Sequence, residues 1–266
     1  MKSSVIPIGH LNDKIIIVTG STQGLGEAIA RQAAICGAAG LIVCGRKQQA
    51  GEAVAQSIQT QTGTPAYFVR TDLTQLAECQ NLITACCDYF GRVDGLVNAA
   101  GISTRGTIEN TDAALFDELI SVNLKAPFFM MQAAIKVMQQ QQIQGSIVNI
   151  ASISSYGGQS YLTPYVASKA GLVALTRNVA HSQKWHRIRC NALNIGWTET
   201  PNEHAVQQQM GKGKDWLQKA APSLPSGQLL QPPQIAKKVV FLLSDDSVPI
   251  TGSIIDWDQQ PLYCWD

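Results

Sequence analysis

Tyr165, Lys169 and Ser152 are the residues of this sequence best suited to proton transfer. On a helix, residues four apart lie on one face with Cβ atoms about 5–6 Å apart, so the Lys169 ammonium can approach the Tyr165 phenol. An ordinary tyrosine titrates near pH ~10, and acid–base work near neutrality needs a fall of roughly 3 units. A nearby cation favours the phenolate. We therefore expect Lys169 to lower the pKa of Tyr165.

A tyrosine and lysine four residues apart also occur by chance on many helices, and Tyr156 and Tyr161 are rival phenols. Neither rival has a lysine four residues later. Tyr165 is further favoured by an ordered set of motifs. Ser152 and the pair of Tyr165 and Lys169 are preceded by a glycine-rich turn, the segment NAAG at 98–101 and Asn123.

The glycine-rich turn follows an apolar run of four residues at 15–18. Strand, tight turn and helix in this order form a binding site for a dinucleotide pyrophosphate, because glycines allow close backbone approach and the helix N-terminus presents free N–H groups. The residues expected to hold the pyrophosphate are Gly20, Ser21, Gln23, Gly24, Leu25 and Gly26.

Composition narrows the range of partners. The 266 residues carry a formal net charge of +1 and no long basic block, which does not indicate binding to nucleic acid or to an acidic membrane. No apolar run approaches the roughly 20 residues that span a bilayer, and the first residues lack the apolar core of a signal peptide. We expect a cytoplasmic protein that binds a small neutral or polar molecule.

The cysteines and histidines show no metal-binding pattern. Seven cysteines are scattered without C-x-x-C spacing, and four histidines do not cluster with carboxylates or cysteines. Several cysteines lie in apolar segments, which is typical of reduced, buried thiols. We expect no disulfide framework and no catalytic metal.

Short β-rich runs alternate with helical stretches along the sequence, which is typical of a parallel sheet with helices on both faces. The expected strands are residues 15–18, 41–44, 66–69, 95–97, 146–150, 188–193 and 253–255. The expected helices run from the glycines to about residue 37, over 75–90, over 112–138 and onward from Pro164. One domain over 1–266 is expected, with the Pro- and Gly-rich segment 197–233 as a long irregular lid over the substrate.

Together these motifs resemble the short-chain dehydrogenase/reductase superfamily, in its compact single-domain branch, over nearly the whole sequence. The matching residues beyond the glycine turn are Asp72, Asn98 to Gly101, Asn123, Ser152, Tyr165 and Lys169, with segment 189–200, residues 242–244 and residues 251–252. The resemblance implies an α/β, Rossmann-type doubly wound parallel sheet of about seven strands with helices on both faces. It also implies a homotetramer or homodimer.

The resemblance further implies an oxidoreductase that transfers a hydride between a nicotinamide dinucleotide and a carbonyl or secondary alcohol. Tyr165 would be the general acid in reduction and the general base in oxidation, and Ser152 would hydrogen-bond the substrate oxygen. Lys169 would also hold the nicotinamide ribose, and Asn123 would hold a water of the proton relay. Ser154 and Ser155 are rivals to Ser152, but the separation 165 − 152 = 13 matches the spacing usual in the superfamily.

Other cofactor contacts are implied by the same resemblance. Asp72 would contact the adenine, Asn98 the adenosine-side ribose, and Thr198 and Thr200 the nicotinamide carboxamide. Further cofactor contacts would come from Leu73, Ala99, Gly101 and Gly196. Asp72 has a structural alternative, a cap on the helix that starts near Gln75. Ile195 stands where the superfamily usually has proline, which leaves the stiffness of this backbone open.

The choice of dinucleotide depends on the end of the second expected strand, which reads CGRK at 44–47. Relatives that prefer NAD usually carry an acidic residue there, which accepts from the ribose 2′-OH. Gly45 occupies that position, and the Arg46 guanidinium is suited to a 2′-phosphate. We therefore expect NADP(H) to be preferred, with NAD(H) as the alternative if Arg46 and Lys47 only form a solvated turn.

Candidate residues for the substrate pocket mix aromatic and polar groups: Ser103, Ser154, Tyr156, Gln159, Tyr161, Trp197, Glu203 and His204, beside Ser152 and Tyr165. This mixture favours a small polar or hydroxylated carbonyl or alcohol, such as a polyol, a sugar or a cyclic ketone. Two alternatives are a 3-oxoacyl-carrier-protein reductase-like enzyme and a non-catalytic dinucleotide-binding sensor or scaffold. The tail 257–266 could reach the pocket of a neighbouring subunit.

Overall fold

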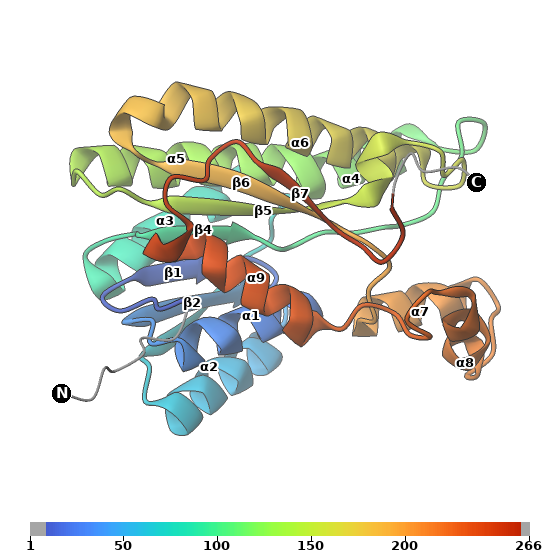
Figure 1. The fold of residues 1–266 in the computed structure, drawn as a ribbon, viewed down its shortest axis with the longest axis horizontal. Helices are drawn as coiled ribbons and strands as arrows, with labels where there is room; N and C mark the ends of the chain where they lie inside the picture. Colours follow the sequence, from blue (N-terminus) through green and yellow to red (C-terminus); the bar gives the residue numbers. More distant parts are fainter. Residues whose placement is uncertain (1–8, 262–266) are drawn as a thin grey trace.

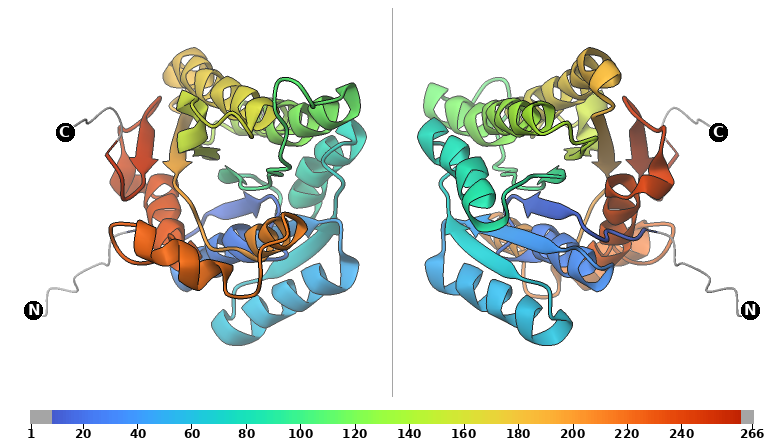
Figure 2. Two further views of the ribbon diagram at one scale, coloured as in Figure 1. Left: turned by 90° about the vertical axis from the view of Figure 1, so that its right-hand side faces the viewer. Right: turned by 90° about the vertical axis from the view of Figure 1, so that its left-hand side faces the viewer.

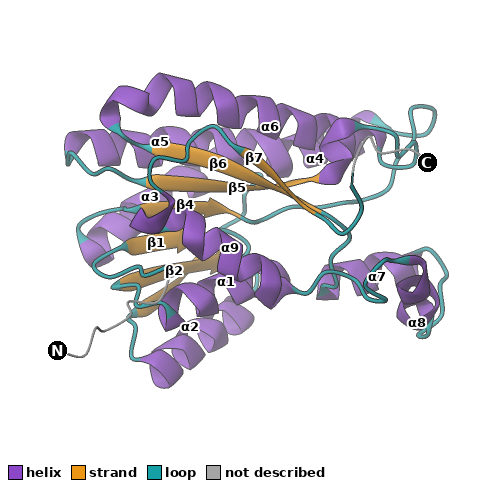
Figure 3. Cartoon of the chain, in the orientation of Figure 1, coloured by secondary structure: helices purple, strands orange, loops and turns teal. Residues whose placement is uncertain are grey.

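A computed structural model of the chain describes residues 9–261, and within that range seven parallel strands form one sheet between two layers of helices (Figure 3). The strand order is β3-β2-β1-β4-β5-β6-β7. Successive strands are added toward one edge of the sheet up to β3 and toward the other edge from β4 onward, so the order switches between β1 and β4. The strands are β1 (Ile15–Val18), β2 (Gly40–Gly45), β3 (Ala66–Arg70), β4 (Gly95–Asn98), β5 (Ser146–Ser152), β6 (Arg189–Ile195) and β7 (Ile254–Trp257). Each expected strand is present, with ends shifted by up to two residues, and the predicted doubly wound α/β sheet is confirmed.

Helices cover both faces of the sheet (Figures 1 and 2). One face packs against α1 (Gly24–Ile35), α2 (Gln48–Thr62) and α9 (Pro232–Leu243). The other packs against α3 (Leu76–Phe90), α5 (Ala126–Gln140) and α6 (Thr163–Gln183). The sheet is therefore buried on both sides.

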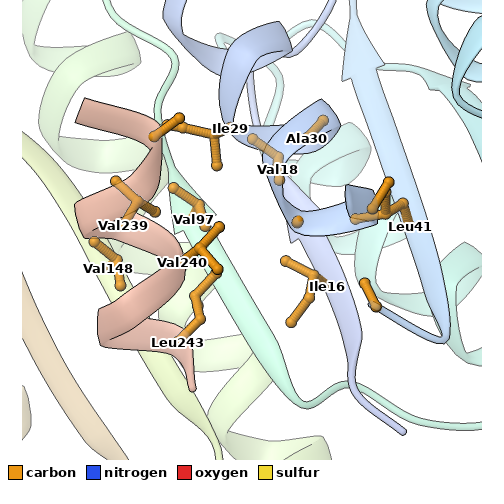
Figure 4. Packing of buried hydrophobic residues seen from close by; sticks show 14 of the residues in the cluster. Ile16, Val18, Ile29, Ala30, Leu41, Val97, Val148, Val239, Val240 and Leu243 are labelled. Atoms are coloured by element: carbon orange, nitrogen blue, oxygen red, sulfur yellow. The ribbon is translucent and has the colours of Figure 1, made fainter. Parts of the chain in front are cut away.

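The four residues of β1 show why the strands read as unbroken apolar runs. Ile16 and Val18 pack with α1 and α9 in one cluster, whose centre is shown in Figure 4. Ile15 and Ile17 point to the opposite face and join the cluster under α3 and α5. Because successive side chains of a strand alternate between faces, a sheet covered on both sides needs apolar residues at every position.

Helix α2 was not expected from the sequence. Its fifteen residues are rich in glutamine, and the buried side chains form a narrow stripe of Val54, Ala55 and Ile58 beside Gly51. A Cβ at Gly51 would lie 2.0 Å from the Phe68 ring, so glycine permits the close packing of α2 on β3. The weak apolar periodicity of the segment concealed this helix.

The helix expected over 112–138 is confirmed, with one irregularity. It consists of α4 (Ala113–Ile120), a π-helical turn at Ser121–Lys125, and α5. The Asp112 carboxylate begins it by accepting a hydrogen bond from Leu115 N at 2.8 Å. A π turn inside a helix is frequent at functional sites, and this one carries Asn123.

The expectation that 197–233 is one long irregular loop was wrong. The segment contains α7 (Pro201–Gln209), α8 (Trp216–Ala220) and a 3₁₀ turn at Ala221–Ser223. Helix α7 has a regular start, because Thr200 Oγ1 accepts from Glu203 N at 3.1 Å and proline occupies the first helical position. Both helices stand apart from the two layers (Figure 1).

The six cysteines within residues 9–261 are all free thiols. Burial raises the pKa of Cys44 and of Cys190 to about 12, so these thiols stay protonated and behave as small apolar side chains. In the same range, no helix is both long enough and apolar enough to span a bilayer.

Candidate active site

A cavity of about 890 Å³ opens at the carboxyl edge of the sheet. Its walls come from the segments that follow β1 to β7 and from α7. Ligands of open α/β sheets bind at this edge, near the point where the strand order reverses. Most of the predicted site residues line this cavity: Gly20, Gln23, Gly24, Leu25, Gly26, Arg46, Asp72, Leu73, Ala99, Gly101, Ser152, Ser154, Tyr165, Lys169, Gly196, Trp197, Thr198 and Thr200.

The glycine turn forms a backbone cradle at one end of the cavity. Gly20 and Gly24 have φ values of +65° and +60°, which glycine adopts without strain. A Cβ at Gly26 would lie 2.3 Å from the Gly20 carbonyl oxygen. No side chain caps the first turn of α1, whose N-cap is Gln23. Free N–H groups, the positive end of the helix dipole and a surface without side chains fit a diphosphate.

Three predicted site residues point into the protein and do not line the cavity. Ser21 Oγ donates to Val18 O at 2.6 Å and accepts from Cys44 N at 3.0 Å. Asn98 Nδ2 donates to Asn149 Oδ1 at 2.8 Å. Ser21 therefore links the ends of β1 and β2, and Asn98 links β4 to β5. The third is Asn123.

Asn123 fixes the loop that follows β4. Its Oδ1 accepts from Ile102 N at 2.9 Å, and its Nδ2 donates to Ile102 O at 2.9 Å and to Ser168 Oγ at 3.1 Å. A Cβ at Gly101 would lie 3.4 Å from both Asn123 Oδ1 and Lys169 Nζ. The amide therefore lies close to the lysine ammonium but is fully buried.

Ser152 and Tyr165 meet at the cavity from different elements. Ser152 ends β5, and its Oγ donates to Ser154 Oγ at 3.1 Å. Tyr165 lies in the first turn of α6, which begins at Thr163 with Pro164 next. Burial raises the pKa of Tyr165, while a hydrogen bond with Ser152 and the positive charge of Arg105 act against that rise.

The expected fall in the pKa of Tyr165 is not found, because burial outweighs the groups that lower this pKa, and Lys169 is not among those groups. Lys169 is 4 % exposed, and its Nζ donates to Ile150 O at 2.8 Å, 5.7 Å from the centre of the Tyr165 ring. Burial is the cause that lowers the pKa of the Lys169 ammonium to about 8. The cation that favours the phenolate is Arg105.

Arg46 and Asp72 lie near each other on the cradle side of the cavity. Asp72 Oδ1 accepts from Thr74 N at 3.0 Å and from Thr74 Oγ1 at 2.9 Å. These hydrogen bonds, with smaller contributions from the charges of Arg46 and Arg70, lower the pKa of the carboxyl. Asp72 therefore closes the turn before α3, whose N-cap is Gln75, and also faces the cavity.

Strand pairing fixes the backbone at Ile195. The residue pairs with Ser152 on one side and with Trp257 on the other. Gly196 N donates to Trp257 O at 3.0 Å, and Thr198 Oγ1 donates to Gly196 O at 2.9 Å. The segment is held by the sheet without the proline usual at this position.

Sequence reasoning missed several cavity residues, among them Arg105 and Gln207. Gln207 lies one helical turn after Glu203 on α7, and its Nε2 donates to Glu203 Oε1. The same oxygen accepts from Trp197 Nε1 at 2.8 Å and lies 3.7 Å from Arg105 Nη2. The spacing of four residues would have indicated this pair, but the segment was expected to be irregular.

The remaining substrate candidates divide into two groups. Ser103, Gln159, Tyr161 and Glu203 line the cavity, but Tyr156 and His204 do not. Tyr156 Oη donates to Asp256 Oδ1 at 3.0 Å. Within residues 9–261 no three His, Cys, Asp or Glu side chains are grouped as metal ligands.

The described part of the C-terminal segment lies against residues 226–228 of the same chain. Gln259 Oε1 accepts from Ser226 N at 2.9 Å, and Gln259 Nε2 donates to Gln228 O at 2.9 Å. Asp258 and Gln260 line the cavity. The reach of the tail 257–266 into a neighbouring subunit stays a prediction, and residues 262–266 lie outside the described part.

Comparison with known proteins agrees with this geometry. A sequence model described as enoyl-(acyl carrier protein) reductase matches residues 20–259. Levodione reductase from Leifsonia aquatica is 31 % identical over 263 residues, covering 97 % of each chain. L-Rhamnose 1-dehydrogenase (NAD(P)(+)) from Azotobacter vinelandii is 33 % identical over 247 residues, covering 91 % of this chain and 94 % of that protein. A crystal structure of an actinorhodin polyketide ketoreductase variant with NADPH has a TM-score of 0.87 and 26 % identity, covering 93 % of this chain and 96 % of that one. This chain belongs to the short-chain dehydrogenase/reductase superfamily.

Proposed function

We propose that this protein is an NADP(H)-dependent oxidoreductase that interconverts a carbonyl and a secondary alcohol, with Tyr165 as the general acid and base. The observation that supports this most is the convergence of Ser152, Tyr165 and Lys169 on the cavity whose other end is the glycine cradle. Superfamily membership supports the reaction class. Screening carbonyls and alcohols by nicotinamide absorbance, with each dinucleotide, tests the proposal.

The cradle of Gly20, Gly24 and Gly26 would hold the pyrophosphate, and Lys169 and Thr198 would face the nicotinamide half. The dinucleotide supplies the hydride. Ser152 and Tyr165 present two hydroxyl groups to the substrate oxygen, where negative charge develops as hydride arrives. Tyr165 then gives its proton to that oxygen, and in the reverse direction removes it. Asn123 and Lys169 would hold the proton-transfer groups in place.

The NADP(H) preference is supported by the end of β2. A Cβ at Gly45 would lie 2.8 Å from Thr22 Cγ2, so an acidic side chain there would need a local shift. Arg46 follows directly, is exposed and lines the cavity. A guanidinium in this place attracts a 2′-phosphate, and no carboxylate at position 45 repels one.

Arg46→Ala is expected to weaken NADPH binding about tenfold or more and to change NADH binding little, because a charge-assisted hydrogen bond is worth about 1.5–3 kcal/mol. Thermal melting with each dinucleotide measures both affinities. Lys47→Ala is the matched control, since Lys47 is the exposed neighbour and does not line the cavity. An unchanged NADPH to NADH affinity ratio in Arg46→Ala would disprove the NADP(H) preference.

The two reaction directions are expected to differ in pH dependence. Because burial raises the pKa of Tyr165, the phenol is protonated near neutral pH and ready to donate in reduction. Oxidation needs the phenolate, whose fraction rises up to about tenfold per pH unit below the pKa. Initial rates from pH 6 to 9 at saturating dinucleotide should rise for oxidation and not for reduction. Oxidation that slows as pH rises would contradict a tyrosine base.

The segment 197–233 is proposed as the substrate lid, because α7 contributes Glu203 and Gln207 to the cavity wall. The cytoplasmic location and the homotetramer or homodimer stay predictions. A 3-oxoacyl-carrier-protein reductase-like activity is the second candidate, because the description of the matching family, enoyl-(acyl carrier protein) reductase, also names an acyl carrier protein. Turnover of an acyl group on carrier protein, compared with the same group on a short thiol, tests it.

A further inference from the structure

Helix α7 presents a buried carboxylate and a buried amide to the cavity. Glu203 is 8 % exposed and Gln207 is 2 % exposed, and both line the same cavity as Ser152 and Tyr165. Proton transfer as proposed above uses neither of them. Burial of two polar side chains costs free energy unless their hydrogen-bonding capacity is used.

Hydrogen bonds fix the orientation of both groups. Glu203 Oε1 accepts from Trp197 Nε1 at 2.8 Å and from Gln207 Nε2. Rotating the Gln207 amide by half a turn would place its oxygen against the carboxylate, so the nitrogen faces Glu203. Gln207 Oε1 is then a buried acceptor without a donor among the described residues.

An unused buried acceptor indicates the chemistry of the missing partner. Gln207 Oε1 and the carboxylate of Glu203 both accept hydrogen bonds, so the complementary group is a donor. A hydroxyl group donates, whereas a ketone or a carboxylate cannot. Leaving such an acceptor buried without a donor is costly, which makes a site of this kind selective.

The ion pair of Arg105 and Glu203 weakens the attraction of this part of the cavity for an anionic ligand. Glu203 and Arg105 act on the pKa of Tyr165 in opposite directions, because their charges have opposite signs. Arg105 Nη2 lies 3.7 Å from Glu203 Oε1 and offsets its charge. A substrate carboxylate would meet a cation that Glu203 already partly neutralises.

We infer that Glu203 and Gln207 form a hydroxyl-binding subsite, which selects a neutral substrate that carries a second hydroxyl next to the carbon oxidised or reduced at Tyr165. This inference rests on the proposed function and adds the substrate class. The adjacent position is part of the inference, and its support is that Glu203 and Gln207 line the same cavity as Ser152 and Tyr165. Vicinal diols, hydroxyketones and sugars have this arrangement.

The test compares trans-1,2-cyclohexanediol with cyclohexanol as substrates for oxidation with NADP⁺. The two probes share a ring and differ by one hydroxyl. Wild-type protein is expected to prefer the diol at least tenfold in kcat/KM. In Gln207→Met this preference falls about tenfold or more, because the side chain keeps its volume and loses the acceptor.

Gln208→Met is the matched control, since Gln208 lies on the exposed side of the same helix and does not line the cavity. This variant should keep the wild-type preference within about twofold, as expected for an exposed position. Glu203→Gln provides a second variant if Gln207→Met does not fold. Equal kcat/KM for the two probes in wild type, or an unchanged preference in both site variants, would overturn the inference.

Melting of Tyr165→Phe with NADP⁺ separates this inference from the proposed function, because the readout needs no turnover. A larger rise in Tm with the diol than with cyclohexanol supports the subsite, and equal rises overturn it. Absence of dinucleotide-dependent turnover with every carbonyl and alcohol tried would refute the proposed function alone.

Discussion

Tyr165→Phe is expected to lower kcat about 10³-fold, since general acid–base catalysis contributes typically 10²–10⁴-fold. The variant removes only the phenolic oxygen, which is the proposed proton donor and hydrogen-bond partner of the substrate oxygen. Dinucleotide affinity should stay within about threefold, because the glycine cradle would bind by backbone N–H groups that the substitution leaves intact.

Nicotinamide absorbance measures turnover, and thermal melting with NADP⁺ measures the dinucleotide affinity. Tyr89→Phe is the control for loss of a phenolic oxygen at an exposed position, where the ring stacks on Tyr67 at 4.1 Å. Equal turnover of Tyr165→Phe and wild type would exclude the tyrosine mechanism. Dinucleotide binding without turnover in wild type itself would favour the sensor or scaffold alternative.

Lys169→Met is expected to remove most activity and to stabilise the ligand-free protein by about 2 kcal/mol at pH 7. A shift of the ammonium pKa from 10.5 to about 8 corresponds to roughly 3 kcal/mol of cost for the buried charge. Loss of the hydrogen bond to Ile150 O offsets about 1 kcal/mol. Methionine fills a similar volume without the charge.

The stabilisation should depend on pH in a definite direction. Lys169 has a lower pKa in the folded protein than in the unfolded chain, so between about pH 8 and 10.5 the unfolded chain holds more protons. Stability of wild type relative to Lys169→Met therefore rises through this window. Urea unfolding at pH 7 and pH 9.5 should show the advantage of the variant shrinking by about 2 kcal/mol. A variant that is less stable than wild type at both pH values would contradict this account.

Local patterns in the sequence predicted most of the strands and helices of the fold. Residues 15–18 are four apolar residues before a glycine-rich turn, and both the strand and the helix after it could be predicted because the two signals are adjacent. Helix α2 could not, since its buried stripe is only Val54, Ala55 and Ile58 in a glutamine-rich segment. The same is true of α7, where glycines and prolines nearby indicated a loop.

The sequence by itself determined which groups could do chemistry: the glycine turn, Ser152, Tyr165 and Lys169, because their spacing along one chain limits where they can lie. Only the tertiary structure decided what surrounds them. Packing of the π-helical turn against α6 and the loop after β4 buried Asn123, and burial set the pKa of Tyr165 and of Lys169. Arg105 and Gln207 reach the cavity from distant segments. Burial and charge depend on distances between residues far apart in the chain, and no local pattern encodes those distances.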